Sequence, residues 1–233
     1  MRRAVVQARW EFSLLIRNGE QALLTLVIPV ALLLAVRALG RTTIAEAVPA
    51  IMAVSLLATC FTSLAIATGF ERRSGAIRYA AVTPLTRIEL LLGKLMATTG
   101  LAIVSLIVVA VIGVAIGWRP AGTWPLALPF VIIGGAAFAA WGVLLAGILR
   151  AEAVLAVANG LFVLLIAFGG VLIAPSAMPT PIAVVVGLLP TAAVADGLRA
   201  TLATSAMPWS DLIVLVIWLL AGTLIARRTF RWD

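Results

Sequence analysis

The chain has 233 residues, of which 64% are hydrophobic and 11% are charged, and its formal net charge is +8. Its mean hydropathy of +1.20 exceeds what a soluble domain carries, so composition predicts an integral membrane protein with one membrane domain over residues 1–233. The basic residues collect beside apolar runs, where they set topology, which argues against nucleic-acid binding. Cys60 is the only cysteine, so no intrachain disulfide is possible.

The first twenty residues are interrupted by charges and do not resemble a cleavable signal peptide. On a helical wheel the arginines share one face, and an apolar face beside it contains Phe12 and Leu15. This pattern predicts a helix in the membrane interface, with its arginines at anionic lipid headgroups and its apolar face in the acyl boundary. The residues assigned to this interfacial helix are Arg2, Arg3, Arg9, Trp10, Phe12 and Arg17.

Six apolar segments follow that we expect to cross the bilayer. Because backbone amides in lipid have no water to pair with, each segment is expected to be a helix, which predicts an all-α membrane protein with six transmembrane helices. Their approximate bounds are 23–39, 48–70, 90–118, 125–149, 153–173 and 212–226. An even number of crossings places both termini on the same side of the membrane.

The distribution of basic residues predicts which side that is, because Lys and Arg near the ends of spans are retained in the cytoplasm. With the amino terminus inside, thirteen of the 17 Lys and Arg residues lie in inner segments. The four in outer segments are Arg37, Arg41, Arg119 and Arg199. Both termini are therefore predicted to be cytoplasmic.

The densest cluster of charges falls in residues 71–89, between the second and third predicted spans. Residues 71–81 are predicted to form a short helix, and Pro84 disfavours helical geometry in the residue before it. Thr86 and Glu89 have the spacing of a capping box that opens the third span. A conspicuous inner loop of this kind indicates a docking surface for a cytoplasmic partner. The alternative is a solvated basic loop that only sets topology.

Five prolines divide residues 174–210, between the last two predicted spans. The apolar piece 182–189 is too short to cross, since eight helical residues extend about 12 Å and the hydrocarbon core is about 30 Å thick. After Pro190, a short outward-facing helix is predicted, with Asp196 and Arg199 at i, i+3 spacing. We expect a re-entrant pair of half-helices at the outer mouth of a pathway, and an ordinary outer loop is the alternative.

No segment of the sequence supports catalysis. Histidine is absent, which removes the commonest general base and zinc ligand. The pair Gly93-Lys94 lacks the other residues of a phosphate-binding loop, so the chain is not expected to hydrolyse ATP. We predict no catalytic residue, no metal site and no cofactor of its own. No Asp, Glu or Lys lies in the middle of a span, which argues against an ion-coupled carrier, although backbone carbonyls can bind sodium.

Several of these segments resemble the membrane subunit of the ABC-2 family of ATP-binding-cassette exporters, a group that includes permeases of the daunorubicin-resistance type. The matching features are the basic amino-terminal helix, Pro29 in the first span, Phe70-Glu71-Arg72-Arg73-Ser74-Gly75, Thr83-Pro84-Leu85-Thr86-Arg87, Gly93-Lys94, Leu189-Pro190 and Leu198-Arg199. The resemblance covers nearly the whole chain. No large outer domain is expected from this sequence.

The resemblance implies that residues 71–79 are a coupling helix that docks in a cleft of a separate ABC ATP-binding subunit, which binds ATP and magnesium. It also implies that the amino-terminal stretch is a connecting helix and that two permease subunits, identical or related, form the pathway. The residues assigned to ATPase coupling are Glu71, Arg72, Arg73, Ser74, Gly75, Arg78, Tyr79, Pro84 and Arg87.

The expected function is export of an amphipathic substrate, such as a drug or a lipid, across the bacterial cell membrane by a multi-pass permease. Drug export would make the chain a multidrug-resistance protein. Two alternatives stay open on the sequence: a membrane anchor or scaffold that transports nothing, and a stand-alone ion-coupled carrier.

Overall fold

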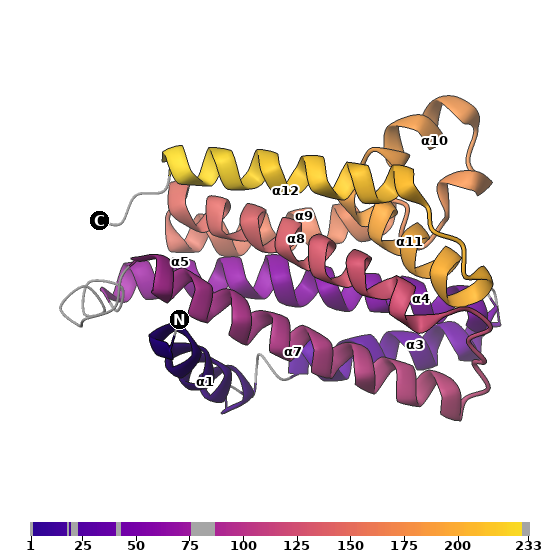
Figure 1. Ribbon diagram of the computed structural model, residues 1–233, viewed down its shortest axis with the longest axis horizontal. Coiled ribbons are helices and arrows are strands. Elements are labelled where there is room, and N and C mark those ends of the chain that lie inside the picture. Colours follow the sequence, from indigo (N-terminus) through magenta and orange to yellow (C-terminus); the bar gives the residue numbers. More distant parts are fainter. Residues whose placement is uncertain (1, 18, 20–22, 41–42, 76–86, 230–233) are drawn as a thin grey trace.

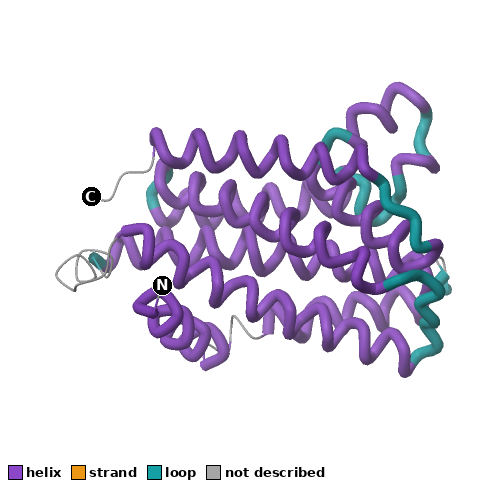
Figure 2. Tube along the Cα trace, in the orientation of Figure 1, coloured by secondary structure: helices purple, strands orange, loops and turns teal. Residues whose placement is uncertain are grey.

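The computed structural model describes residues 2–17, 19, 23–40, 43–75 and 87–229. Every regular element in these ranges is helical and none is a strand (Figures 1 and 2), which confirms the all-α prediction. In chain order the elements are α1 (Arg2–Arg17), η1 (Leu23–Val27), α3 (Ile28–Leu39), α4 (Ile44–Leu57), η2 (Ala58–Ser63), α5 (Leu64–Ser74), α7 (Arg87–Ala115), η3 (Trp124–Ala127), α8 (Leu128–Ile148), α9 (Ala151–Phe168), η4 (Pro175–Ala177), α10 (Thr180–Gly187), α11 (Pro190–Thr204) and α12 (Trp209–Thr229).

Five helices in the described part of the chain are long and apolar enough to cross a membrane, and a bent pair brings the number to six if it counts as one span. The five are Ile44–Ser74, Leu92–Ala115, Trp124–Ile148, Ala151–Phe168 and Trp209–Thr229. Each of them coincides with one of the predicted spans, because runs of this length leave the chain no other way to satisfy its backbone in lipid.

The first predicted span, residues 23–39, differs from the other five. Its described apolar helix, Thr25–Leu39, is shorter than the other five. Its first turns, in η1, are π-helical. The sixth candidate span is therefore the bent pair of α10 and α11, which the sequence predicted as half-helices.

The continuous helix formed by α4, η2 and α5 lies at the centre of the bundle. In its most apolar stretch 83% of the residues are buried, against 17% in α9 and 11% in α12. The outer helices α9 and α12 therefore present apolar side chains such as Val163 and Ile217 to the surroundings, as lipid-facing helices do. The middle of the central helix is therefore largely enclosed by protein.

Close packing against the middle of this helix depends on a glycine. A Cβ added at Gly142 of α8 would lie 2.8 Å from the carbonyl oxygen of Phe61, a contact that no side chain tolerates. Phe61 belongs to η2, whose π-helical winding follows the regular α-helical turns of α4. Short π-helical segments within α-helices frequently occur at functional sites.

The helix pair α10 and α11 confirms the prediction of an interrupted segment, with a bend of 95° between its two members. The outward-facing orientation predicted for residues 191–202 was wrong, because most of α11 is buried. Small side chains allow this: Gly197 packs so closely on the ring of Phe130 that an added Cβ would lie 2.1 Å from it. The helix thus fits inside the bundle beside α4, α8 and α12.

The prediction that a separate helix begins at Glu71 was also wrong. Residues 71–74 are the last turn of α5, and Gly75 ends that helix with a left-handed φ of 77°. The helix continues past its apolar stretch because its charged side chains find partners on neighbouring helices. The rest of the predicted coupling helix, including Arg78 and Tyr79, lies outside the described residues, as do Pro84 and Thr86.

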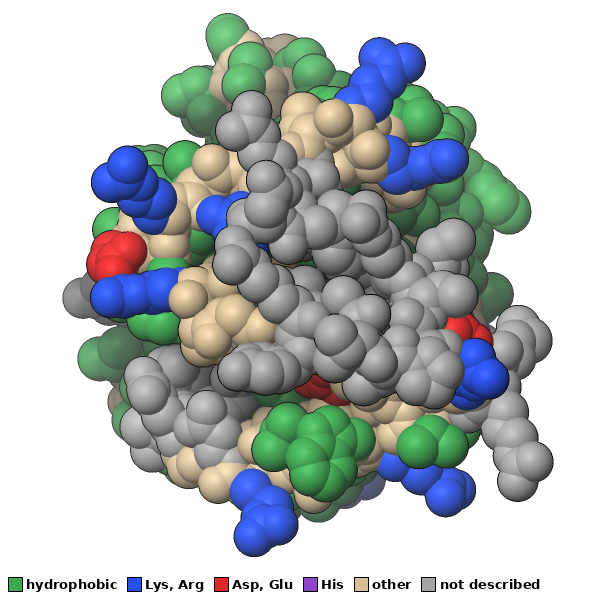
Figure 3. All heavy atoms as spheres, turned by 90° about the vertical axis from the view of Figure 1, so that its left-hand side faces the viewer, with side chains coloured by type: hydrophobic (Ala, Val, Ile, Leu, Met, Phe, Trp, Pro, Cys, Tyr) green, Lys and Arg blue, Asp and Glu red, His purple; other side chains and the backbone are tan. Residues whose placement is uncertain are grey.

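The ends of several helices meet at one end of the bundle, on the left in Figure 1. The amino-terminal helix α1, the end of α5, the turn between α8 and α9, and the end of α12 all lie there. Figure 3 shows this end with Lys and Arg side chains spread around it. The basic residues that these elements contribute include Arg9, Arg72, Arg73, Arg150, Arg227 and Arg228.

A candidate coupling site at the base of α5

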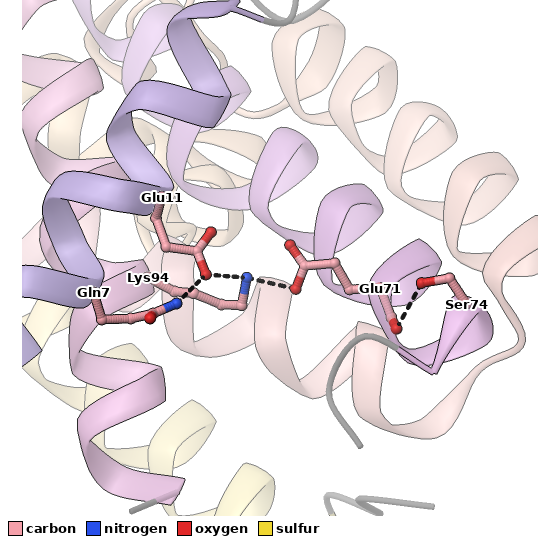
Figure 4. Close-up of polar contacts among 5 residues, drawn as sticks. All are labelled: Gln7, Glu11, Glu71, Ser74 and Lys94. Atoms are coloured by element: carbon pink, nitrogen blue, oxygen red, sulfur yellow. Dashed lines mark hydrogen bonds and ion pairs between the residues drawn. The ribbon is translucent and has the colours of Figure 1, made fainter. Parts of the chain in front are cut away.

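Lys94, near the start of α7, is buried although it carries a charge. Its side chain is only 6% exposed, and its Nζ donates to Oε1 of Glu11 at 3.0 Å and to Oε2 of Glu71 at 2.5 Å (Figure 4). Burial of an unpaired ammonium group costs several kcal/mol, so the two carboxylates are what make this position tolerable. The three charges hold together three helices, α1, α5 and α7, that are far apart in sequence.

The fourth member of this cluster is Gln7, one turn before Glu11 on α1. Its Nε2 donates to the same carboxylate oxygen of Glu11 at 2.9 Å. Figure 4 shows the two bonds that meet at this oxygen, one from Gln7 and one from Lys94. We call Gln7, Glu11, Glu71 and Lys94 the Lys94 junction.

A small cavity adjoins the Lys94 junction and runs toward the π-helical segment η2. Its volume is about 20 Å³, which is room for about one water molecule. The cavity extends the polar environment of the charges into the centre of the bundle. Its lining consists of Glu11, Leu15, Thr59, Ser63, Leu64, Ala67, Glu71, Lys94, Thr98 and Leu101.

Gly93 is the reason that α1 comes near enough for Glu11 to reach Lys94. A Cβ at this position would lie 2.6 Å from Cγ and 2.9 Å from Cβ of Gln7. Only glycine leaves space for α1 to lie directly on α7 here. The pair Gly93-Lys94 lacks the other residues of a phosphate-binding loop and instead has a structural role. Gly93 allows α1 to approach α7 closely, and Lys94 supplies the buried charge that bonds to Glu11.

The two arginines after Glu71 point to another pair of helices. Nη1 and Nη2 of Arg72 donate to the carbonyl oxygens of Gly147 and Leu149, at 2.6 and 2.5 Å, where α8 ends. Arg73 forms an ion pair with Glu152 in the first turn of α9. Hydrogen bonds from a charged donor contribute about 1.5–3 kcal/mol, whereas an exposed ion pair contributes about 0.2–1 kcal/mol. Arg72 is therefore the stronger link.

Ser74 and Gly75 complete the base of α5. The hydroxyl of Ser74 donates to the carbonyl oxygen of Glu71 at 3.1 Å, and the backbone N–H of Gly75 donates to the carbonyl of Arg72 at 3.3 Å. These bonds satisfy carbonyls of the last turn, and the left-handed glycine then turns the chain away. Arg87 is the first residue of α7, and its side chain lies outside the described part.

The amino-terminal stretch predicted as an interfacial helix over residues 1–20 contains α1, Arg2–Arg17, and two apolar residues of α1 face the protein. The ring of Phe12 packs against Gly100 of α7, and Leu15 lines the cavity. The surface of α1 that is exposed instead carries Val6, Trp10 and Leu14. The prediction that the face with Phe12 and Leu15 meets the lipid was wrong. Arginines and apolar residues alternate around this helix, so it has two apolar surfaces. The contact with α7 decides which of the two faces the protein.

The other residues assigned to the interfacial helix lie on the exposed side of α1. Arg3, Arg9, Trp10 and Arg17 are exposed, while Arg2 starts the helix with a side chain outside the described part. Three arginines and one tryptophan on an exposed surface at one end of the bundle suit a helix at a lipid headgroup layer. That location stays a prediction.

Helix α11 has its own polar contacts around Arg199. Its Nη1 donates to Oδ1 of Asp196 at 2.6 Å and to the carbonyl of Gly170 at 3.3 Å, and its Nη2 donates to the carbonyl of Val171. Thr191 donates to the neighbouring carbonyl of Gly169 at 2.8 Å. Pro190 is buried at the start of α11. The i, i+3 pair predicted from sequence therefore also anchors the chain that leaves α9.

Sequence reasoning missed Lys94 as the partner of Glu71 and Glu11 as the second partner of Lys94. The only signal for Glu11 is that an acidic residue interrupts the side of α1 formed by Ala8 and Leu15. Lys94 stood in a matching motif, yet nothing in its neighbours indicates that it is buried. The pairing depends on tertiary contact between residues 83 positions apart.

Comparison with known proteins gives the family of the chain. Residues 23–227 match the family model described as ABC-2 family transporter protein, which covers most of the sequence. A comparison with curated proteins finds no match. Proteins of this family are multi-pass membrane subunits that take part in transport and generally pair with ABC ATPase subunits. The chain therefore belongs to the ABC-2 family of transporters, as a non-catalytic transmembrane subunit.

Proposed function

We propose that the chain is the permease of an ATP-driven exporter and that the Lys94 junction transmits motion from an ATPase partner into the membrane helices. Membership of the ABC-2 family supports the transporter role. The observation that carries the coupling role is that Lys94 bonds Glu71, on the last turn of α5, to Glu11 on α1. A displacement of α5 therefore reaches α1 and α7 through charged contacts.

The residues proposed to take part in ATPase coupling lie between the last turn of the central helix and the start of α7. Glu71, Arg72 and Arg73 make their contacts with other helices of this chain, so their proposed role is to relay motion rather than to touch the ATPase. Ser74 and Gly75 shape the end of α5. Arg78, Tyr79, Pro84 and Arg87 are the residues proposed to meet the ATPase.

In this proposal both termini and the coupling residues lie in the cytoplasm of a bacterial cell. The bias of Lys and Arg toward one set of segments supports this orientation. The proposed assembly contains two permeases, identical or related, each with an ATPase that binds ATP and magnesium. The outer segment with Pro190, Asp196 and Arg199 is proposed to close the outer mouth of the pathway.

The proposed substrate is amphipathic, such as a drug or a lipid, and the proposed direction is export, as for permeases of the daunorubicin-resistance type. The rich supply of Ala, Val and Leu in the helices supports an amphipathic cargo over a strongly charged one. The absence of histidine and of a phosphate-binding loop in the sequence supports an energy source outside the chain.

The decisive experiment is affinity purification of the chain from its own membranes in a mild detergent, followed by mass identification of the proteins that accompany it. We expect an ABC ATPase to co-purify and its ATP hydrolysis to change when the permease is removed. Glu71→Gln is expected to weaken this effect on hydrolysis several-fold while the ATPase still co-purifies. Recovery of the chain without any ATPase would contradict the proposal.

A second measurement separates this function from a stand-alone carrier. Fluorescent amphipathic probes are added to the solution outside inverted vesicles that contain the permease and the co-purified ATPase. Probe uptake into the vesicles is then followed with and without ATP. Uptake that requires ATP supports export. Uptake of equal rate without ATP would favour the carrier, and the lack of uptake of every amphipathic probe would contradict the proposed substrate class.

A further inference from the structure

Only two residues connect α8 to α9, and a side chain from α5 caps the point where they turn. Helix α8 ends at Ile148 and α9 begins at Ala151. The last carbonyls of a helix have no partner within the helix, and Arg72 bonds one of them, at Gly147, together with the carbonyl of the capping residue Leu149. The guanidinium charge also lies at the negative end of the α8 dipole, where a cation is favourable.

The geometry of the guanidinium explains why arginine suits this position. Its planar fork directs two N–H donors at two separate acceptors at once, and here the acceptors lie on either side of Ile148. A lysine supplies one compact charge and would bond one carbonyl at a time. Glutamine supplies neutral donors of shorter reach. The contact is therefore specific to arginine and not to positive charge alone.

The neighbouring pair of Arg73 and Glu152 joins the same two regions but is a weaker link. Both side chains are about 60% exposed, so water and salt screen the attraction. Glu152 also lies in the first turn of α9, where the helix dipole favours an acid without any help from Arg73. Arg73 thus provides a matched control for Arg72, at the adjacent position and with the same charge.

The last turn of α5 consequently has two sets of partners. Glu71 faces Lys94 and, through it, α1 and α7, whereas Arg72 faces the turn between α8 and α9. A movement of this one turn is therefore shared between two groups of membrane helices that have few other polar contacts with each other in the described part of the chain.

We infer that Arg72 is a positioning residue for coupling: it carries a displacement of the base of α5 to the turn between α8 and α9, so that these helices move together with α1 and α7. This inference rests on the proposed function, because the displacement comes from the ATPase. It adds a second path for the movement of α5, from Arg72 to the turn between α8 and α9, beside the path through Lys94 to α1 and α7.

The experiment uses the complex of the permease with its co-purified ATPase in lipid nanodiscs. Backbone hydrogen exchange is measured by mass spectrometry without nucleotide and after trapping with ATP and vanadate. In the natural sequence we expect trapping to change exchange both at residues 67–74 and at residues 149–156. The variants compared are Arg72→Gln, Arg72→Lys and Arg73→Gln.

Arg72→Gln is expected to reduce the nucleotide-dependent change at residues 149–156 at least tenfold while the change at residues 67–74 stays. Arg72→Lys should give an intermediate loss, and Arg73→Gln less than a twofold loss. A merely structural role would alter exchange equally with and without nucleotide and would leave the difference between the two states intact. If Arg72→Gln does not fold, a response of Arg72→Lys equal to that of the natural sequence overturns the inference.

The two proposals fail in different ways. If no ATPase co-purifies, or if trapping changes exchange nowhere in the permease, the proposed function fails and this inference fails with it. If trapping changes residues 67–74 and 149–156 alike in Arg72→Gln, the proposed function stands and only the role of Arg72 is overturned.

Discussion

Lys94 and Glu71 form an ion pair of 2.5 Å in which the ammonium is almost completely removed from water while the carboxylate is about one-third exposed. The lysine side chain is 6% exposed and that of glutamate 32%. The two members therefore differ in what they lose when their partner is removed: an unpaired Lys94 stays buried, whereas an unpaired Glu71 can be hydrated.

The first prediction depends on the second carboxylate at Lys94, that of Glu11, whose side chain is only 11% exposed. Glu71→Gln keeps a hydrogen-bond acceptor beside Lys94 and leaves Glu11 in place, so it should lower the free energy of unfolding only slightly. Lys94→Met leaves two carboxylates near each other without a cation, and removal of one partner of a buried pair costs about 3–5 kcal/mol. Thermal unfolding in detergent, followed by tryptophan fluorescence, should show a much lower midpoint for Lys94→Met.

The control is the triple variant Glu11→Gln, Glu71→Gln and Lys94→Met, in which the charges are removed together. It should recover most of the lost stability, since replacement of a whole buried ionic group is often neutral. A triple variant as unstable as Lys94→Met would show that the loss comes from packing rather than from unpaired charge.

The second prediction concerns the approach of α1 to α7. Gly93→Ala places a methyl group 2.6 Å from Cγ of Gln7, so α1 must move and the bond between Glu11 and Lys94 must lengthen. We expect faster protease cleavage of α1 and a lower unfolding midpoint. Gly160→Ala is the matched control, because nothing lies within 4 Å of that position and alanine is favourable in a helix by about 0.5–1 kcal/mol. Equal behaviour of the two variants would contradict the prediction.

The third prediction addresses the contacts of Arg199 on α11. Arg199→Gln removes the charge beside Asp196 and frees the carbonyls of Gly170 and Val171. Each unsatisfied polar group costs about 1–3 kcal/mol, so the chain after α9 should become more accessible. Hydrogen exchange at residues 169–174 is expected to rise at least tenfold.

Thr191→Val provides the comparison for Arg199, because it removes one neutral hydrogen bond to Gly169 and preserves the shape of the side chain. It should raise exchange in the same residues by a smaller factor. An increase in Thr191→Val that exceeds the increase in Arg199→Gln would reverse the order of the two anchors.

The fourth prediction concerns two tryptophans between α8 and α12. The indole N–H of Trp141 donates to the carbonyl of Trp218 at 3.0 Å, and their rings meet edge to face with centroids 5.2 Å apart. Trp141→Phe keeps an aromatic ring but loses the hydrogen bond, which within a membrane contributes about 0.6 kcal/mol on average. The unfolding midpoint should therefore fall only slightly.

Gly222→Ala tests the same contact from the other helix. Its added methyl group would lie 2.7 Å from Nε1 of Trp141, so the indole must leave its position and the two rings must separate. We expect a larger fall in midpoint than for Trp141→Phe and a shift in the emission spectrum. Combination of both variants should be less than additive, because phenylalanine leaves space for the methyl group.

The sequence predicts the membrane helices well and their partners poorly, for one physical reason. A long apolar run such as Ala151–Phe168 has a single solution in lipid, so its helix follows from composition alone. The partner of a buried charge depends instead on which helices meet. Nothing within a few residues of Lys94 indicates that Glu11, 83 positions earlier, lies beside it.

The same distinction explains the corrected details. The wheel of α1 identifies the helix but not its inner face, because that choice belongs to α7 and to Gly93. The burial of α11 depends on the small side chains that fit around Phe130, which hydropathy does not register. The extension of α5 through Arg72 requires acceptors at the end of α8, 75 positions later.

The π-helical segment η2 sets which helix each charge at the base of α5 meets. An α-helix turns about 100° per residue, and a π-helical turn holds about one residue more than an α-helical turn. If residues 58–63 were wound as a regular α-helix without a change in length, α5 would therefore be rotated by roughly a quarter of a revolution. Glu71 would then no longer face the ammonium group of Lys94, and the guanidinium of Arg72 would no longer face the carbonyls of Gly147 and Leu149. The direction in which both side chains point is thus set within residues 58–63, a segment that contains no charged residue.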